Sequence, residues 1–254
     1  MAQLDGIWWS EAGDGPAVVV PRLNVDWTEM NLSALTDRFR VVIVAPQGFG
    51  QSARPGSYHG TRFVADIRRV LDHLEIGRYA TFGYSMNGAM AARLGVGSPR
   101  VTAVACGGFP LTADLTGMAE RARGRNAVAR QDPETWTELV AAYDPEAAVA
   151  FWDDVARLPH AALAEVDCPV RAWWGERDAV LSSLLSPDEL GRDLASRGVE
   201  YNVMPGLDHT GMLDRLDLVL PTIASWLADQ FSRDASLRRC PGTPRGEASR
   251  TPGG

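Results

Sequence analysis

One serine of this sequence stands in a context that could make it a nucleophile. Gly83-Tyr84-Ser85 ends an apolar run that starts at Tyr79, and small residues suited to a helix follow it. A serine in a sharp turn between a strand and a helix needs small neighbours, because the two backbones cross closely there. The N-terminus of such a helix also offers free N–H groups and a positive dipole, which favour an oxyanion. The pattern therefore predicts Ser85 as the nucleophile of an acyl-transfer reaction.

A second Gly-x-Ser triplet, which ends at Ser52, tests how specific this signal is. Arg54-Pro55 follows it closely and cannot begin a helix, so we expect Ser52 to belong to a structural loop. Residues 48–53 also resemble a dinucleotide-binding glycine motif. That motif requires a helix directly after it, and the same Arg-Pro pair cannot begin one. The sequence thus gives no support for a nucleotide cofactor.

Composition limits the partners that the chain could have. The formal net charge is -7 and the hydrophobic fraction is 45%, which is typical of a globular protein and gives no reason to expect nucleic acid or an anionic membrane. All 25 basic side chains are arginine, so no lysine Schiff base can form. The three cysteines show neither disulfide nor zinc spacing, and the N-terminus lacks the pattern of a signal peptide. We expect a cytoplasmic protein with no metal and no cofactor, which binds a small-molecule substrate and is compatible with a homodimer.

The elements that must position Ser85 follow from hydrophobic patterning. Short, almost continuous apolar runs alternate with helical periodicity, which predicts a mostly parallel sheet of about eight strands covered by helices on both faces. We expect helices over residues 27–39 and 86–94, and a closing helix over residues 220–231 with Pro221 in its first turn. The fold class predicted is α/β, doubly wound.

One region breaks the alternation. Residues 110–166 show only helical signals, which predicts an all-helical insertion, here called the cap, over a core formed by residues 1–109 and 167–232. Residues 233–254 are rich in Arg, Pro, Gly and Ser, and we expect them to be disordered.

With these features in order, the sequence resembles the α/β-hydrolase superfamily over about residues 5–231. Gly83-Tyr84-Ser85-Met86 is similar to its nucleophile elbow, residues 169–178 to its strand that precedes the acid, and residues 204–209 to its histidine loop. The resemblance implies a triad of Ser85, Asp178 and His209, with oxyanion donors at the N–H groups of Met86 and Leu23.

Physical chemistry supports the same roles. Serine is a weak nucleophile until a neighbouring base takes its proton, and histidine suits that task near neutral pH. A buried carboxylate fixes the imidazole tautomer and stabilises its protonated form. Asp178 and His209 each follow a predicted strand, and the carboxyl ends of parallel strands share one edge of the sheet.

The sequence departs from the family pattern near the predicted oxyanion hole. Pro21-Arg22 stands where family members often have His-Gly, and Asn87 stands where the elbow commonly has glycine. We hypothesise that Arg22 or Asn24 points into the pocket and contacts a substrate carboxylate or carbonyl; an ion pair at the surface is the alternative for Arg22. Further substrate-binding residues are expected among aromatic side chains near the site and in the cap. These candidates are Tyr84, Phe109, Trp136 and Trp152.

The leading hypothesis is a serine hydrolase that cleaves an ester, thioester or lactone of a small to medium, fairly apolar substrate through an acyl-enzyme. The alternative is a cofactor-free lyase, cyclase or oxygenase that reuses the His-Asp pair, because one fold can host several chemistries. A non-catalytic ligand receptor is a third reading, and the full set of triad residues argues against it.

Overall fold

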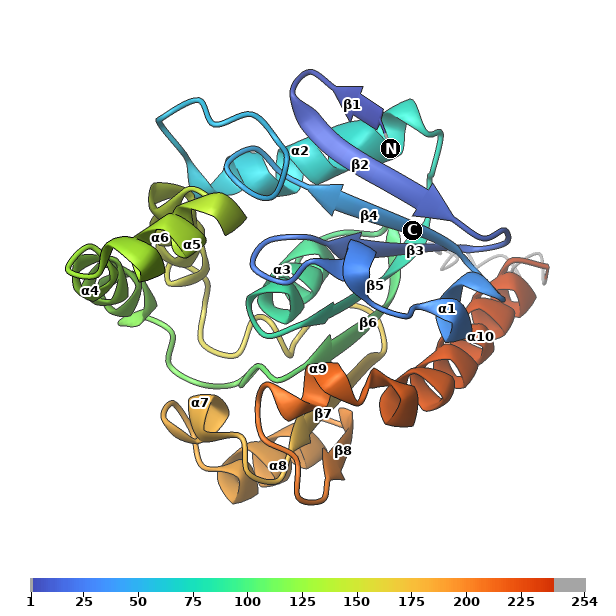
Figure 1. Cartoon of the computed structure of the whole chain (residues 1–254). Coiled ribbons are helices and arrows are strands. Elements are labelled where there is room, and N and C mark those ends of the chain that lie inside the picture. Colours follow the sequence, from blue (N-terminus) through green and yellow to red (C-terminus); the bar gives the residue numbers. More distant parts are fainter. Residues whose placement is uncertain (1, 240–254) are drawn as a thin grey trace, which may run out of the picture.

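The computed structural model describes residues 2–239, and eight of its strands form one sheet in the order β1-β2-β4-β3-β5-β6-β7-β8 (Figure 1). β1 and β2 pair antiparallel to their neighbours, and all the other pairs are parallel. This topology confirms the predicted α/β class. The strands are β1 (Ala2–Leu4), β2 (Ile7–Ala12), β3 (Ala17–Pro21), β4 (Arg40–Ala45), β5 (Tyr79–Tyr84), β6 (Val101–Gly107), β7 (Val170–Gly175) and β8 (Glu200–Met204).

The central strands are buried on both faces, which explains their continuous apolar runs. Successive side chains of a strand point to opposite faces. In β3, Val19 therefore joins the apolar layer under α2 (Gly60–His73) and α3 (Met86–Gly95), while Val18 and Val20 join the layer under α1 (Ser33–Thr36) and α10 (Leu216–Arg239). The two layers hold the sheet between helices and fix the ends of its strands.

Shorter helices complete the core and lie near the ends of strands. They are the 3-10 helix η1 (Trp27–Glu29), α7 (Ala179–Ser182), α8 (Pro187–Ser196) and α9 (Gly211–Asp214). In the part of the chain that the structure describes, no helix is both long enough and apolar enough to pass through a bilayer.

The long helix predicted over residues 27–39 is wrong. Asp26 caps η1 by accepting a hydrogen bond from the Thr28 N–H, and Met30 then adopts an extended backbone that ends the turn. Residues 30–32 separate the two elements, and the chain becomes helical again in α1.

The closing helix differs from its prediction at both ends. α10 begins at Leu216, so Pro221 lies inside it, where a helical hydrogen bond is lost. Burial of Leu216, Val219 and Leu220 against the sheet offsets that loss. The helix also runs to Arg239, into the segment 233–254 predicted to be disordered; residues 240–254 lie outside the described part.

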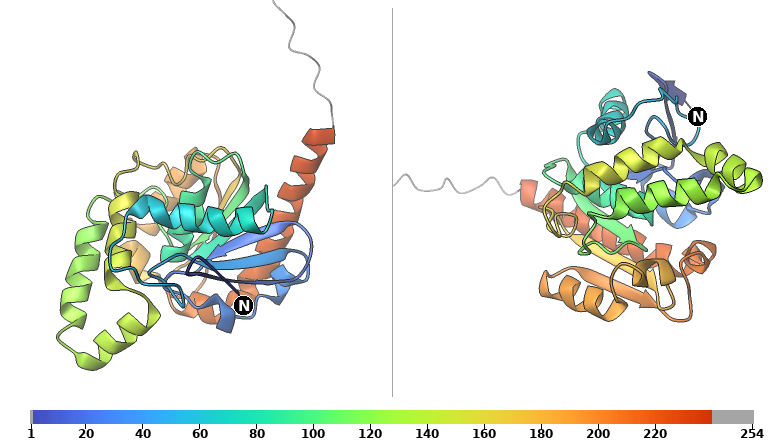
Figure 2. Two further views of the ribbon diagram at one scale, coloured as in Figure 1. Left: turned by 90° about the horizontal axis from the view of Figure 1, so that it is seen from above. Right: turned by 90° about the vertical axis from the view of Figure 1, so that its left-hand side faces the viewer.

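The chain between β6 and β7 forms α4 (Met118–Ala129), α5 (Pro133–Ala142) and α6 (Pro145–Val155). These helices gather on one side of the sheet and lie in front of it in the right-hand view of Figure 2. α6 packs against α2, where the Phe63 and Phe151 rings lie 6.4 Å apart. A largely buried ion pair between Arg93 and Asp154, 2.8 Å long, joins α3 to α6. The cap is thus anchored to the helix that follows the predicted nucleophile.

Candidate active site

Ser85 sits in a strained turn between β5 and α3. Its φ of 57° and ψ of −129° are values that non-glycine residues rarely adopt. The surrounding backbone holds this conformation, since the Ser85 N–H donates to the Gly107 carbonyl at 2.8 Å. Glycine is required at position 83, because a Cβ there would lie 2.3 Å from the backbone oxygen of Asn87. The turn has the geometry that the sequence predicted for a nucleophile elbow.

Three side chains from separate segments form a continuous hydrogen-bonded chain. Ser85 Oγ lies 3.0 Å from His209 Nε2, and His209 Nδ1 lies 2.8 Å from Asp178 Oδ2. With its proton on Nδ1, His209 donates to Asp178 and leaves Nε2 free to accept the Ser85 hydroxyl proton. The arrangement can therefore activate Ser85 for attack on a carbonyl group.

The Asp178 carboxylate forms hydrogen bonds with the backbone of α7 as well as with His209. Its side chain is fully buried and caps the short helix α7, where Oδ1 accepts the Leu181 N–H at 2.8 Å. Buried carboxylate oxygens need hydrogen-bond partners, because leaving them unpaired costs free energy. Because one oxygen is fixed by α7, the other is aimed at His209.

Tyr84 was predicted to bind substrate, and the structure places it elsewhere. Its ring is fully buried and lies 5.1 Å from the His209 ring, and its hydroxyl donates to the His209 carbonyl at 2.9 Å. Burial, followed by the negative charge of Asp178, raises the pKa of this hydroxyl, so it stays protonated and remains a donor. Tyr84 thus packs against the histidine loop and does not line the cavity beside Ser85.

The two predicted oxyanion donors differ in availability. Met86 is the first residue of α3, so its N–H has no acceptor within the helix. The Leu23 N–H, in contrast, already donates to Asn87 Oδ1 at 2.5 Å, and both residues are buried. The predicted donor at Leu23 is therefore occupied in this structure, because Asn87, which stands in place of the usual elbow glycine, reaches across to the loop after β3.

Arg22 does not contact the cavity, contrary to the predicted role in substrate binding. Its guanidinium pairs with Asp26, binds Gln51, and lies 5.0 Å from the centre of the Trp8 ring. The residue is only 7% exposed. Arg22 is thus a structural cation that ties the loop after β3 to its neighbours.

A cavity of about 220 Å³ opens beside Ser85 and Met86. The predicted residues Asn24, Phe109 and Trp152 line it, and the last two rings are stacked with centres 5.8 Å apart. The prediction for Trp136 is wrong: this residue lies on α5, outside the lining, with the Arg130 guanidinium 4.7 Å above its ring.

Several lining residues escaped sequence reasoning. Most belong to α4 and α7, two helices that the sequence did not assign to the site. They are Met118, Arg121, Ala122, Arg125, Val180, Leu181 and Leu184. Those on α4 recur at helical spacing, and this was the one signal that could have indicated a face turned toward the cavity.

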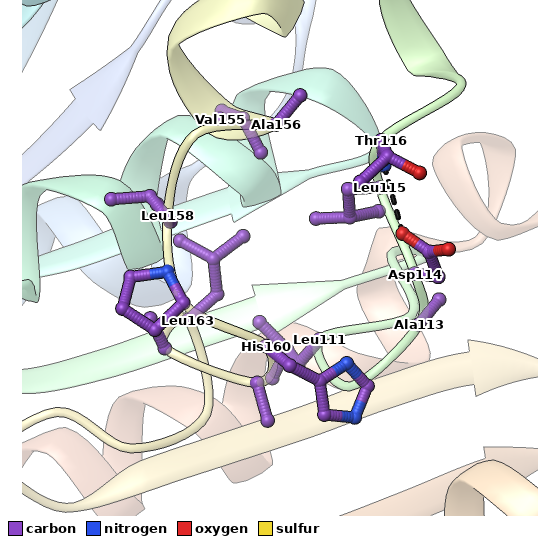
Figure 3. Close-up of a pocket in the computed structure, with 13 residues that line it drawn as sticks. Leu111, Ala113, Asp114, Leu115, Thr116, Val155, Ala156, Leu158, His160 and Leu163 are labelled. Carbon is purple, nitrogen blue, oxygen red and sulfur yellow. Dashed lines mark hydrogen bonds between the residues drawn. The ribbon is translucent and has the colours of Figure 1, made fainter.

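A second, smaller hollow of about 90 Å³ lies between the segments that lead into and out of the cap (Figure 3). Leu111, Asp114 and His160 line it, and the Asp114 carboxylate accepts the Thr116 N–H at 3.0 Å. Ser85 is not part of this lining, and His160 does not line the Ser85 cavity.

Two further features bear on other chemistries. Ser52, the serine of the second Gly-x-Ser triplet, is buried and accepts the Trp8 N–H while donating to the Ala45 carbonyl, as expected for a structural serine. Among residues 2–239 no group of three or more His, Cys, Asp or Glu side chains could hold a metal ion.

Comparison with known proteins places this geometry in context. The family model described as "Alpha/beta hydrolase family" matches residues 7–222. A carboxylesterase from Nitrososphaera gargenis has a similar structure, with a TM-score of 0.68 and 19% identity over 92% of this chain and 99% of that one.

Two other solved structures are similar. A thermophilic esterase from Thermogutta terrifontis has a TM-score of 0.67 and 21% identity, covering 88% of this chain and 93% of its own. The enol-lactonase from Burkholderia xenovorans LB400 has a TM-score of 0.64 and 21% identity, covering 87% and 96%. At these identities the likeness shows a shared fold.

Proposed function

Because the chain belongs to the alpha/beta hydrolase family, we propose that it is a serine hydrolase that cleaves a carboxylic ester, thioester or lactone through an acyl-enzyme. The observation that carries this proposal is the hydrogen-bonded chain from Ser85 through His209 to Asp178. The names of the similar structures, two esterases and a lactonase, agree with the bond type.

The reaction would proceed in two halves. Ser85 Oγ attacks the carbonyl carbon while His209 Nε2 takes its proton, and the protonated histidine then gives that proton to the leaving alcohol or thiol. Water, deprotonated by His209, attacks the acyl-enzyme and releases the acid. Asp178 stabilises the protonated imidazole in both halves, and Tyr84 holds the histidine loop in place.

The carbonyl oxygen gains negative charge in both halves and needs donors. Met86 is the first residue of α3 and lines the cavity beside Ser85, so its N–H, which has no acceptor within the helix, can stabilise this charge. The Leu23 N–H can join it only when Asn87 releases it. The Met86 N–H is therefore available to the oxyanion, whereas the Leu23 N–H becomes available only after its hydrogen bond to Asn87 breaks.

A fluorophosphonate probe tests the proposal, because it reacts with an activated serine. We expect a covalent adduct at Ser85, located by peptide mass spectrometry, that is abolished in Ser85→Ala and His209→Ala. Ser183→Ala is the matched control, since Ser183 is exposed at the end of α7 and hydrogen-bonds only its own helix. Absence of labelling in a folded native protein contradicts the hydrolase.

The occupied Leu23 N–H favours a second candidate, a cofactor-free lyase, cyclase or oxygenase that uses His209 and Asp178 without an acyl-enzyme. Such an enzyme has less need of a complete oxyanion hole. Its signature is activity that survives Ser85→Ala but is lost in His209→Ala.

A further inference from the structure

Two arginines belong to the wall of the Ser85 cavity. Arg121 and Arg125 are four residues apart on α4 and share one face of the helix. Met118 and Ala122 on the same side also line the cavity, which shows that α4 turns this face toward Ser85. Both arginines are exposed, so an entering substrate can meet them.

Neither arginine has a counter-charge among the described residues. Arg121 forms no hydrogen bond or ion pair there, and the contact of Arg125 is with the Tyr143 ring, 6.0 Å from its centre. Arg123 differs sharply: it lies between them on α4, points away from the cavity, and pairs with Glu120 and with Asp153 at 3.0 Å. The two cavity arginines are thus left for an external anion.

The rest of the wall supports this interpretation. No Asp or Glu is among the described residues that line the cavity, and Asp178 beneath it is fully buried and already engaged. The remaining surface is largely apolar, with Phe109, Trp152 and Leu184 among its members. A positive charge beside apolar walls suits an aliphatic chain that ends in a carboxylate, the partner that the guanidinium fork matches best.

We infer that Arg121 and Arg125 bind a carboxylate of the substrate, and that the enzyme therefore prefers esters whose acyl chain carries a second, free carboxyl group. The inference rests on the proposed hydrolase for its reaction, but the anion site itself does not depend on Ser85.

Matched pairs of esters test it. The monoethyl esters of straight-chain dicarboxylic acids, with two to eight methylene groups, are compared with ethyl esters of monocarboxylic acids of the same length, by following ethanol release. The native enzyme should favour the charged member about tenfold or more in kcat/KM at the best length. The KM of the charged ester should also rise with added NaCl, because salt screens the guanidinium groups.

Variants then assign the preference to residues. Arg121→Gln and Arg125→Gln should each reduce the charged-to-neutral ratio of kcat/KM by about tenfold, mainly through a higher KM for the charged ester. Arg123→Gln is the control, because it removes the same charge from the same helix outside the cavity, and it should keep the ratio within about twofold.

The outcomes separate this inference from the proposed function. Hydrolysis that depends on Ser85 but shows no preference for the charged ester at any length overturns the inference and leaves the hydrolase standing. If no ester is cleaved, the binding of adipate and suberate to the Ser85→Ala protein is measured by calorimetry. Binding that becomes weaker when Arg121→Gln is added to this protein supports the anion site, and no binding overturns it.

Discussion

Replacing Asn87 with glycine tests how the oxyanion site works. Asn87 Oδ1 accepts the Leu23 N–H at 2.5 Å, in a place where both residues are buried. Asn87→Gly removes the acceptor and leaves the backbone of α3 in place, so the Leu23 N–H becomes available beside that of Met86. We expect this variant to hydrolyse esters faster than the native protein.

The size of the effect follows from the cost of freeing one donor. If the native protein frees Leu23 during catalysis, it must leave Asn87 Oδ1 buried and unpaired, at a cost of about 1–3 kcal/mol. Removing that cost raises kcat by roughly 5-fold to 150-fold. If the native protein never frees Leu23, the gain approaches the full value of one donor, about 100-fold to 1000-fold.

The variant should be less stable even as it becomes faster. A buried Leu23 N–H left without its acceptor costs about 1–3 kcal/mol, and glycine in a helix adds a few tenths. For a chain of this size, Tm should fall by about 3–14 °C. Steady-state kinetics on an ethyl ester and thermal unfolding measure both effects, with Ala92→Gly as a control that adds a glycine to α3 without touching Leu23.

A kcat that stays the same or falls in a folded Asn87→Gly protein would refute this reasoning. Asn87→Ala gives an independent check, because it also frees Leu23 but adds no backbone flexibility. A loss of activity in both variants would mean that the elbow needs the Asn87 side chain, whose Nδ2 is buried with no hydrogen-bond partner among the described residues.

Three further predictions concern stability. Arg93→Met leaves the Asp154 carboxylate buried without its partner, so the free energy of unfolding should fall by about 3–5 kcal/mol in denaturant titrations. Gly107→Ala places a Cβ 2.2 Å from the Trp173 ring, and we expect a loss of several kcal/mol, measured the same way. Burial raises the pKa of Asp66, so the folded protein holds this proton more tightly than the unfolded chain and becomes less stable as pH rises through that pKa. Asp66→Asn should therefore gain stability relative to the native protein as pH rises above the ordinary pKa of an aspartate.

Each of these predictions has a control. Arg123→Met removes two exposed ion pairs and should cost no more than about 1 kcal/mol. Gly117→Ala adds a Cβ with nothing within 4 Å, and a loss as large as that of Gly107→Ala would contradict the steric argument. For Asp66→Asn, a relative stability that falls as pH rises would show that the carboxylate is stabilised in the fold.

Features encoded within a few residues could be predicted from the sequence. The strained turn at Ser85 needs Gly83 two positions earlier, and the alternation of apolar strands with helices specified the mostly parallel sheet. The resemblance to the α/β-hydrolase superfamily implied Asp178 and His209, and the strand that each of them follows supported the assignment. Local backbone requirements and hydrophobic period carry this information.

Only the tertiary structure decided which side chains from distant segments meet. Leu23 and Asn87 are 64 positions apart, and nothing in the sequence near either residue indicates that the Leu23 N–H donates to the Asn87 side chain. Arg22 is a second case, because the path of the loop after β3 decides that it pairs with Asp26 and does not line the cavity. Arg121 and Arg125 are a third, because the orientation of α4 decides that they line it. Helical spacing places residues on a common face, but the direction in which that face points depends on how the whole helix packs.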